Sequence, residues 1–165
     1  MNQKELMLLD WMRKIHQLEY AHCFQSLYFS RIEKTIGVSA FILSTAVAFT
    51  YRFPFIGYPC VKEYILPFIL FLVAILTGYQ SFIKPGEKAE THRKLGIEYE
   101  KIRHEIETIL TGKMDDPKLD SHIAGVKNKW DALNTIYVSQ RHYDNAKAKV
   151  KSFNKYPKEL DFIKT

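Results

Sequence analysis

The side chains best suited to chemistry in this sequence belong to six histidines and two cysteines. They are His16, His22, His92, His104, His122 and His142, together with Cys23 and Cys60. Two metal ligands on one helix face stand three or four residues apart, and no two of the histidines have that spacing. The sequence also lacks a Cys-x-x-Cys pair, a His-Glu-x-x-His motif, a glycine-rich phosphate loop and a nucleophile elbow. We therefore expect no catalytic residue, no bound metal, no cofactor and no enzymatic activity.

One of these histidines, His92, stands within a stripe of otherwise mostly apolar residues. The stripe consists of Ala89, His92, Leu95, Tyr99, Ile102, Ile106 and Ile109. Its alternating three- and four-residue steps are typical of a helix face that packs into the core of a bundle. We expect His92 in that core, where buried polar groups are normally hydrogen bonded. The alternative role for His92 is a switch or a contact between subunits.

The elements that must position these residues include two strongly apolar runs. The net charge of +6 and the mean hydropathy of -0.21 resemble those of an ordinary basic protein. However, no charged residue lies between Lys34 and Arg52, or between Glu63 and Lys84. About 20 apolar residues in a helix cross a hydrocarbon core of about 30 Å, so we predict a transmembrane hairpin over residues 35–83. The rival structure, a soluble bundle, needs apolar cover around the second run, and the charged remainder of the chain offers little.

Basic residues near the ends of the two runs predict the orientation of the hairpin. On one side lie Arg31, Lys34, Lys84, Lys88, Arg93 and Lys94, whereas the connection 52–63 has only two basic residues. Both chain termini should therefore be cytoplasmic. We expect Pro54 and Pro59 to make the turn in the connection. We also expect an aromatic belt at the interface, formed by Phe53, Phe55, Tyr58 and Tyr64. Cys23 and Cys60 would then lie on opposite sides of the membrane, where they cannot pair within one chain.

Small and hydroxyl-bearing residues divide the first span into two faces. The small-residue face consists of Gly37, Ala40, Ser44 and Ala48. The hydroxyl face consists of Thr35, Ser39, Ala46 and Thr50. Small residues let membrane helices approach closely, so we expect the small-residue face to pack against the second span. The hydroxyl face is then free for a neighbouring subunit or a water-filled pore, unless its hydroxyls only bond the carbonyls of their own helix.

Outside the spans the apolar spacing predicts three further helical stretches. An amphipathic helix over residues 3–33 should run without interruption into the first span. Pro85-Gly86 should break the chain after the second span, and a helix should begin near Glu87. After a turn at 111–120, a last long helix should repeat the stripe. The stripe of this helix is Leu119, Ile123, Val126, Trp130, Leu133, Tyr137 and Gln140.

These elements predict an all-α fold, a transmembrane helical hairpin continuous with a cytoplasmic helical bundle. Residues 1–34 form the cytoplasmic amphipathic helix, residues 35–83 the hairpin, and residues 84–165 the cytoplasmic helical region. Beyond about Ala148 the periodic signal weakens, and the basic, aromatic tail is expected to form a short helix or an ordered strap.

The basic residues after the second span have two different patterns. Over 87–107 they alternate with glutamates, which is typical of a solvated helix face with ion pairs and does not indicate nucleic-acid binding. Only the tail carries a cluster of one sign, made of Lys147, Lys149, Lys151, Lys155 and Lys158. Such a cluster fits either anionic lipid headgroups or a partner that carries nucleic acid.

The order of these features resembles the SLATT superfamily of bacterial two-transmembrane effector proteins. The resemblance spans about residues 10–150, and its most specific part is the segment KAETHRKLGIEYEKIRHEIETIL, 88–110. In that family a small residue, a histidine and then an aromatic residue follow the membrane hairpin. The matching positions here are Ala89, His92 and Tyr99.

The resemblance implies an effector of anti-phage defence in the bacterial inner membrane. Such an effector would form a homo-oligomer and permeabilise or depolarise the membrane when a partner senses infection, giving abortive infection. The implied partner is encoded nearby and is a nucleotidyltransferase, a nucleotide sensor or a reverse transcriptase. The alternative function is a membrane anchor or scaffold that recruits such a partner, and direct binding of nucleic acid is not expected.

Overall fold

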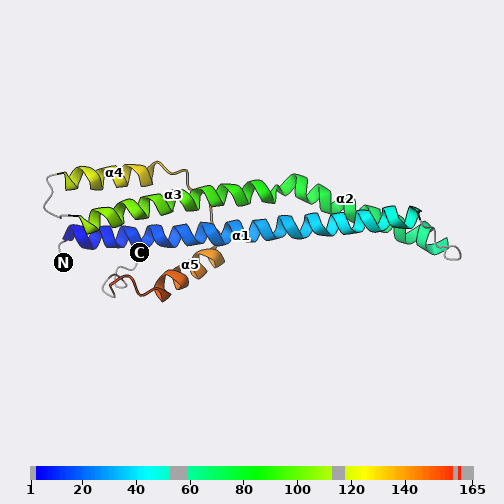
Figure 1. Ribbon diagram of the computed structural model, residues 1–165, viewed down its shortest axis with the longest axis horizontal. Helices are drawn as coiled ribbons and strands as arrows, with labels where there is room; N and C mark the ends of the chain where they lie inside the picture. The colour runs from blue at the N-terminus through cyan, green and yellow to red at the C-terminus, as the bar shows by residue number, and fades with distance from the viewer. Residues whose placement is uncertain (1–2, 53–58, 113–117, 158–159, 161–165) are drawn as a thin grey trace. The chain divides into compact units, whose positions relative to one another are not determined.

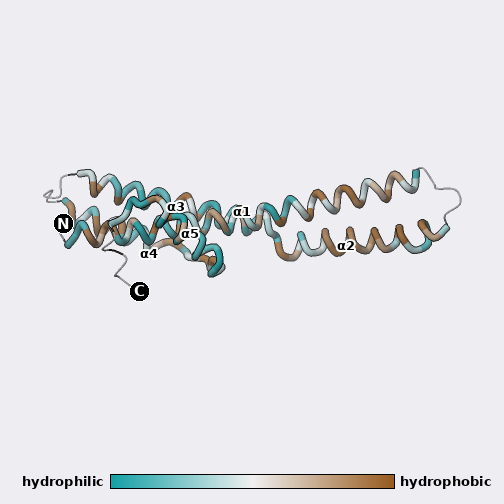
Figure 2. The backbone as a smooth tube through the Cα atoms, turned by 90° about the horizontal axis from the view of Figure 1, so that it is seen from below, coloured by the Kyte–Doolittle hydropathy of each residue, from teal (hydrophilic) through white to brown (hydrophobic). Residues whose placement is uncertain are grey.

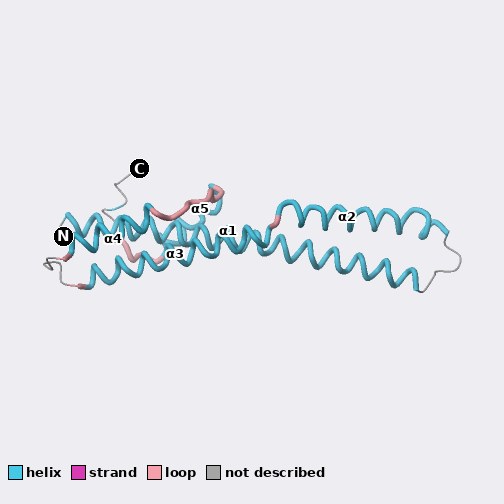
Figure 3. The backbone as a smooth tube through the Cα atoms, turned by 90° about the horizontal axis from the view of Figure 1, so that it is seen from above, coloured by secondary structure: helices cyan, strands magenta, loops and turns pink. Residues whose placement is uncertain are grey.

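The computed structural model describes residues 3–52, 59–112, 118–157 and 160, and these residues form helices and no β-strand (Figures 1 and 3). The all-α class predicted from the sequence is therefore confirmed. In chain order the elements are α1 (Gln3–Arg52), the π-helix η1 (Val61–Ile65), α2 (Leu66–Ile83), α3 (Pro85–Thr111), α4 (Leu119–Asp131) and α5 (Gln140–Ser152).

The chain divides into two compact units. Unit 1 comprises Met1–Ser26 and Glu90–Thr165, and unit 2 comprises Leu27–Ala89. The helices α1 and α3 contribute residues to both units, whereas α2 belongs to unit 2 and α4 and α5 belong to unit 1.

Unit 1 has a hydrophobic core built from three helices. The buried core residues are Leu8, Met12 and Ile15 of α1, Tyr99, Ile102, Ile106 and Ile109 of α3, and Leu119 and Val126 of α4. Their spacing of three or four residues on α1 and α3, and of seven on α4, is the one expected of helix faces that pack together. Trp11 and Trp130 extend the core with an edge-to-face contact at 6.0 Å between ring centroids. The predicted core stripe of residues 89–109 is thus confirmed for its α3 members in unit 1.

Unit 2 leaves most of its apolar side chains exposed. The apolar stretches within the helices Gln3–Arg52 and Val61–Thr111 are each long and apolar enough to cross a membrane, and only 11% and 6% of their residues are buried. The core helix of a soluble protein would be mostly buried. Figure 2 shows the apolar colouring along α2 and along the part of α1 that runs beside it.

A break separates α2 from α3, as predicted from Pro85-Gly86. Lys84 adopts the left-handed conformation with φ 48° and ψ 56°, and its N–H donates to the carbonyl of Gln80 at 3.1 Å. Pro85 then occupies the first position of α3, where its missing N–H costs nothing and its fixed φ suits a helix. The new helix therefore begins two residues earlier than the predicted Glu87.

The prediction of one long helix through Leu133, Tyr137 and Gln140 is wrong. α4 ends at Asp131, and α5 begins at Gln140 after eight residues that are not α-helical. The intervening residues include Asn134 and the β-branched Thr135, Ile136 and Val138, all of which have low helix propensity. Tyr137, predicted in the core stripe, is 81% exposed.

Several predictions about loops fall outside the described residues. They concern Phe53, Pro54, Phe55 and Tyr58 of the connection and residues 113–117 of the predicted turn. Pro59 was predicted to help make the turn, but it is already helical. Tyr64, the remaining member of the predicted aromatic belt, lies in η1 and is exposed.

Candidate functional site

The most enclosed polar contact in unit 1 joins two histidines that stand 70 residues apart. His22 of α1 and His92 of α3 place their Nδ1 atoms 2.9 Å apart, and the two residues are only 1% and 4% exposed. A single proton can lie between two such nitrogens, so one ring donates its Nδ1–H and the other accepts. Each neutral ring thereby satisfies a nitrogen that would otherwise be buried at a cost.

Tyr99 completes this cluster, which we call the histidine pair with Tyr99. Its ring stacks on His22 with centroids 5.4 Å apart and planes 23° apart, and the residue is fully buried. Among the described residues its hydroxyl has no hydrogen-bond partner. Burial raises the pKa of Tyr99. The hydroxyl therefore remains a neutral O–H beside the imidazole rings.

Burial also keeps both histidines neutral. The pKa of His22 is lowered to about 4, first by burial and then by the charge of His92. The pKa of His92 is lowered by burial and then by His142 at the start of α5. Two imidazolium ions in contact would repel each other, so both rings stay neutral at neutral pH. One N–H then lies between the two facing Nδ1 atoms. Chemically, the arrangement can hold α1 against α3 while the rings are neutral, and it resists protonation.

Only one of the partners in this contact was predicted. His92 was expected to be a hydrogen-bonded core histidine, and the structure confirms that reading. His22 was not connected to it, because the two positions are distant in the sequence and neither has a neighbouring ligand motif. Of the three positions that resemble the SLATT pattern, the structure brings His92 and Tyr99 to the same cluster. Ala89 is also buried, but it belongs to unit 2.

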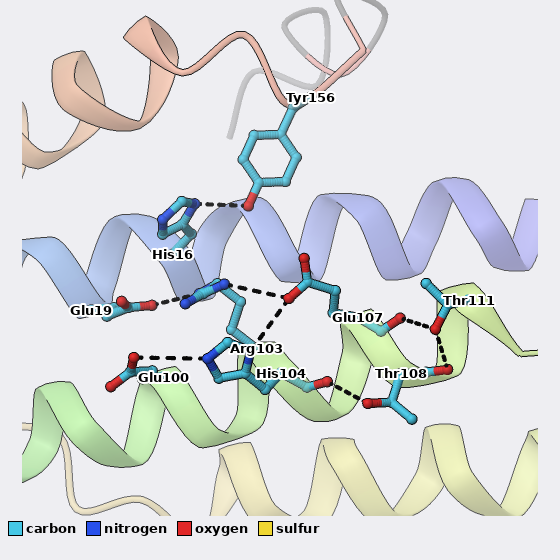
Figure 4. Close-up of polar contacts among 9 residues, drawn as sticks. All are labelled: His16, Glu19, Glu100, Arg103, His104, Glu107, Thr108, Thr111 and Tyr156. Atoms are coloured by element: carbon cyan, nitrogen blue, oxygen red, sulfur yellow. Dashed lines mark hydrogen bonds and ion pairs between the residues drawn. The ribbon is translucent and has the colours of Figure 1, made fainter.

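A second histidine contact joins α1 to the segment after α5. Nδ1 of His16 lies 2.9 Å from the hydroxyl of Tyr156 (Figure 4), and the His16 ring stacks on Phe153 with centroids 5.6 Å apart and planes 10° apart. Tyr20 contacts both of those rings. We call this the His16–Tyr156 clasp. Of the two alternatives expected for the tail, a short helix or an ordered strap, residues 153–157 follow the second, whereas α5 itself continues to Ser152.

Charged groups of α1 and α3 lie close to the clasp. Nε of Arg103 donates to Glu19 at 2.7 Å, and a second nitrogen of Arg103 lies 3.7 Å from Glu107 (Figure 4). Burial, followed by the charges of Arg103 and Lys155, lowers the pKa of His16 to about 4. Burial raises the pKa of Tyr156. The clasp is therefore a bond between a neutral imidazole and a neutral phenol.

The buried side of the first span shares only one residue with the two predicted faces. On this part of α1 the buried residues are Ala40 and Val47, which lie seven residues apart. Gly37 is half-buried with nothing within 4 Å of an added Cβ, and Ser44 and Ala48 are exposed. The prediction that all four small residues pack within the hairpin is therefore wrong except for Ala40. Val47, which is not a small residue, is buried on the same side of the helix as Ala40.

The hydroxyls of this span are bonded to their own helix. Ser44, Thr45 and Thr50 each donate to the carbonyl four residues earlier, at 2.8 Å. Within the hydroxyl face, Thr35 and Ala46 are exposed and Ser39 and Thr50 are half-buried. At about 100° per residue this face lies on one side of Ala40 and Val47, and Gly37, Ser44 and Ala48 lie on the other.

The basic cluster of the tail is exposed wherever it is described. Lys147, Lys149, Lys151 and Lys155 are exposed, and Lys158 lies outside the described residues. The ammonium of Lys149 stands 5.2 Å from the centroid of the Phe153 ring.

The remaining candidate side chains do not converge. His104 is exposed and lies near Glu100 and Glu107 of its own helix (Figure 4). Cys23 and Cys60 are free thiols. Over residues 3–52, 59–112, 118–157 and 160, no group of three or more histidine, cysteine, aspartate or glutamate side chains is placed to hold a metal ion. A comparison of the chain with protein-family models, with curated proteins and with solved structures found no match.

Proposed function

We propose that this protein is a non-enzymatic membrane effector that assembles from several copies and permeabilises or depolarises a bacterial inner membrane. Its two spans would form the membrane part, with both termini in the cytoplasm. Assembly would follow a signal from a partner during phage infection and lead to abortive infection. The role in defence is supported by the resemblance of Ala89, His92 and Tyr99 to the SLATT pattern.

The observation that carries this proposal is the part of the small-residue face other than Ala40, which the hairpin leaves uncovered. Gly37, Ser44 and Ala48 follow each other at seven- and four-residue steps. Among the described residues nothing lies within 4 Å of a Cβ added at Gly37, and Ser44 and Ala48 are exposed. In a membrane, small residues permit close approach of helix backbones and are enriched where helices associate. A second copy of the hairpin is the partner of matching length and chemistry.

The exposed apolar side chains support a location in lipid. Phe41, Phe49, Phe68, Phe71 and Phe82 are all more than half exposed. In water such a surface would drive aggregation, whereas in a bilayer lipid tails cover it. The bonds from Ser44, Thr45 and Thr50 to their own helix satisfy these hydroxyls, so the helix can carry them through the membrane.

Substitutions on the two faces of the first span test assembly and permeation separately. Gly37→Leu and Ser44→Leu place bulk on the small-residue face without filling any space used within one chain, so they should prevent assembly. Val38→Leu, at an exposed apolar position, is the matched control. Cells that express each variant under the triggering condition are followed with a membrane-potential dye. Depolarisation should be lost with the first two variants and retained with the control.

The direct contact between copies can be measured by cross-linking. In a chain with Cys23→Ser and Cys60→Ser, the variant Ser44→Cys should form a disulfide-linked dimer in membranes after oxidation. Ile42→Cys, which points elsewhere on the same helix, should not. A chain that depolarises cells while Ser44→Cys stays monomeric would contradict assembly through this face.

The anchor or scaffold function remains the alternative, and one observation favours it. Unit 1 has its own hydrophobic core and an exposed basic cluster, which a soluble partner could bind. If the spans are passive, Ser39→Leu with Thr50→Leu should leave activity unchanged, and reversing the charge of the tail lysines should abolish it. If the spans form the pore, the hydroxyl-face variant should reduce depolarisation.

A further inference from the structure

Helix α5 is held to the rest of unit 1 by contacts at both of its ends. At its start, the N–H of the N-cap Ser139 donates to the side-chain carbonyl of Gln25 on α1 at 3.2 Å. At its far end, the His16–Tyr156 clasp fixes residues 153–157, which we call the strap (Figure 4). Between the ends, the buried side chains of α5 are those of Ala146 and Val150. This is little apolar contact for a helix of 13 residues, so the attachment of α5 depends largely on its ends.

Three histidines meet at the start of α5. The pKa of His92 on α3 is lowered by burial and then by the charge of His142, which therefore stands close to it in the first turn of α5. His92 in turn contacts His22 of α1 through the two Nδ1 atoms, 2.9 Å apart. Burial, followed by the charge of Arg141, lowers the pKa of His142 itself. A positive charge on His142 would also oppose the helix dipole at the N-terminal end of α5. The contact of α5 with α3 therefore favours neutral histidines.

The clasp at the far end of α5 has the same preference. Burial, followed by the charges of Arg103 and Lys155, lowers the pKa of His16 to about 4, and the charge of Glu107 opposes this shift. Arg103 itself forms ion pairs with Glu19 and Glu107. The charged and titratable side chains that face the contacts at the two ends come from α1, α3, α5 and the strap. They are Arg13, Glu19 and Cys23 of α1, Tyr99, Arg103 and Glu107 of α3, Arg141 of α5, and Lys155 and Tyr156 of the strap. Both ends of α5 therefore bind best when their histidines carry no charge.

We propose that α5 and the strap form an acid-operated lid, which leaves α1 and α3 as one unit when His16, His92 and His142 take up protons. Removal of the lid uncovers these three side chains, so the open state binds protons that the closed state excludes. In the open state the pKa of each histidine returns to about 6.5. The lid is therefore fully stable above that pH and loosens as the pH falls toward about 4.

The number of histidines determines how sharply the lid responds to pH. Uptake of one proton changes such an equilibrium by at most about ten-fold per pH unit, and uptake of several protons makes the response steeper. A protonated His92 can still donate its Nδ1–H to His22, so α1 stays packed on α3 while the lid opens. The lid lies within unit 1 and requires neither a membrane nor a pore.

Cysteine labelling of the full chain in detergent measures the opening of the lid. In a chain with Cys23→Ser and Cys60→Ser, Ala146→Cys places a thiol on the buried side of α5, and Asn145→Cys places one at the exposed neighbouring position. The reagent is a dithiodipyridine, which reacts with thiols in acid as well as at neutral pH. The ratio of the two labelling rates removes the pH dependence of the thiol and reports the open fraction. This ratio should be low at about pH 7 and should rise as the pH falls from about 6.5 to 4, by more than about ten-fold per pH unit in its steepest part.

Substitutions identify the histidines that take up the protons. His16→Phe keeps a ring on Phe153 without a titratable group, and His142→Gln keeps a polar side chain at the start of α5. Each should make the rise of the ratio less steep, and the two together should leave only the contribution of His92. His104→Gln removes an exposed histidine of α3 and should change nothing.

Two further measurements distinguish lid opening from other effects of acid. Val150→Cys, also on the buried side of α5 and closer to the strap, should follow the same curve as Ala146→Cys in every variant, because the lid opens as one unit. Trp11 and Trp130 should keep their fluorescence through the same pH range, because α1, α3 and α4 stay packed.

Four results would overturn the proposal. A labelling ratio that does not change with pH, or one whose pH dependence survives the double substitution, would remove the role of the histidines. If Val150→Cys responded only to His16→Phe, and Ala146→Cys only to His142→Gln, the two ends would detach separately and there would be no single lid. A change in tryptophan fluorescence at the same pH as the change in labelling would show that unit 1 unfolds as a whole.

Discussion

At the scale of single residues, the stability of unit 1 depends on buried polar groups that are satisfied in pairs. The contact between His22 and His92 is the clearest case, because both residues are buried and one Nδ1 donates a hydrogen bond to the other. The net gain from such a bond is about 1 kcal/mol, but leaving one partner alone costs about 1–3 kcal/mol. Removing both histidines should therefore cost less than the sum of the two single removals.

A double-mutant cycle measures this asymmetry. We expect His92→Ala to destabilise unit 1 by about 2–4 kcal/mol, because it leaves a cavity and deprives His22 Nδ1 of its partner. His22→Leu with His92→Phe should cost less than the sum of the two single changes, with a coupling energy of about 0.5–3 kcal/mol. Denaturant unfolding of the full chain in detergent, followed by tryptophan fluorescence, gives these values. The exposed His104→Ala should stay within about 0.5 kcal/mol of the parent, and additive single changes would contradict the pairing.

The His16–Tyr156 clasp should be sensitive to pH in a defined direction. With the tail bound, the pKa of His16 is about 4, and with the tail released it returns toward its ordinary value of about 6.5. Between these values the released state takes up the proton and the bound state does not, so tail binding weakens as the pH falls from about 6.5 to 4. Hydrogen exchange of residues 150–157, corrected for its intrinsic pH dependence, should show decreasing protection across this window.

Two variants separate titration from packing in the clasp. His16→Phe keeps a ring on Phe153 but cannot titrate, so the part of the pH dependence that comes from His16 should disappear. Tyr156→Phe should reduce protection at every pH, with a cost of about 1 kcal/mol. Tyr20→Phe is the matched control, since Tyr20 contacts His16 and Phe153 through its ring. Protection that falls equally with pH in His16→Phe would show that another group titrates.

At the scale of elements, the close approach in unit 2 depends on Gly86 near the start of α3. A Cβ added there would collide with the carboxylate of Glu33 on α1. Gly86→Ala should be tolerated at small cost because the Glu33 side chain can swing away, whereas Gly86→Leu should destabilise this contact by about 1–3 kcal/mol. A Cβ added at Gly78 meets nothing within 4 Å among the described residues, so Gly78→Leu should be neutral or favourable in a single chain. Hydrogen exchange of residues 27–35 and 85–89 in detergent measures the difference.

Elements were predictable from the sequence where local chemistry decides them. Pro85 specifies the break after α2, and the three- and four-residue spacing of Tyr99, Ile102 and Ile106 specifies the α3 core face. The gap between α4 and α5 is hidden in the sequence because Leu133 and Tyr137 continue the heptad spacing, although the residues between them have low helix propensity. The run of β-branched residues before Ser139, a good N-cap type, was the signal that could have located it.

The contacts of the candidate site were less predictable because they join distant parts of the chain. His22 meets His92 and His16 meets Tyr156 only after the helices of unit 1 have packed, and spacing within one helix carries no information about such pairs. The face that packs in the hairpin also depends on its partner. Val47 is buried beside Ala40, whereas the pattern of small residues favoured Ser44 and Ala48.

At the scale of the whole molecule, the membrane placement proposed above implies that the two units are stabilised in different solvents. Unit 1 buries a conventional core, so its stability follows the hydrophobic effect and weakens with denaturant. Unit 2 buries little apolar surface of its own, and in lipid or detergent its helices are held by backbone hydrogen bonds that have no competing water. One chain should therefore unfold in two separate steps.

The two tryptophans make this separation measurable. Trp11 and Trp130 both belong to unit 1 and contact each other, so fluorescence reports that unit alone, whereas far-ultraviolet circular dichroism reports helices of both units. In detergent with increasing guanidinium, fluorescence should complete its transition while a large part of the helical signal remains. Leu8→Ala, in the unit 1 core, should lower the free energy of unfolding obtained from the fluorescence transition by about 2–5 kcal/mol. The residual helical signal should stay unchanged. Val38→Ala, at an exposed position of the first span, should move neither curve by more than about 0.5 kcal/mol. Coincident transitions by both probes would mean that the two units form one cooperative structure, because only then does the loss of the unit 1 core unfold the membrane helices as well.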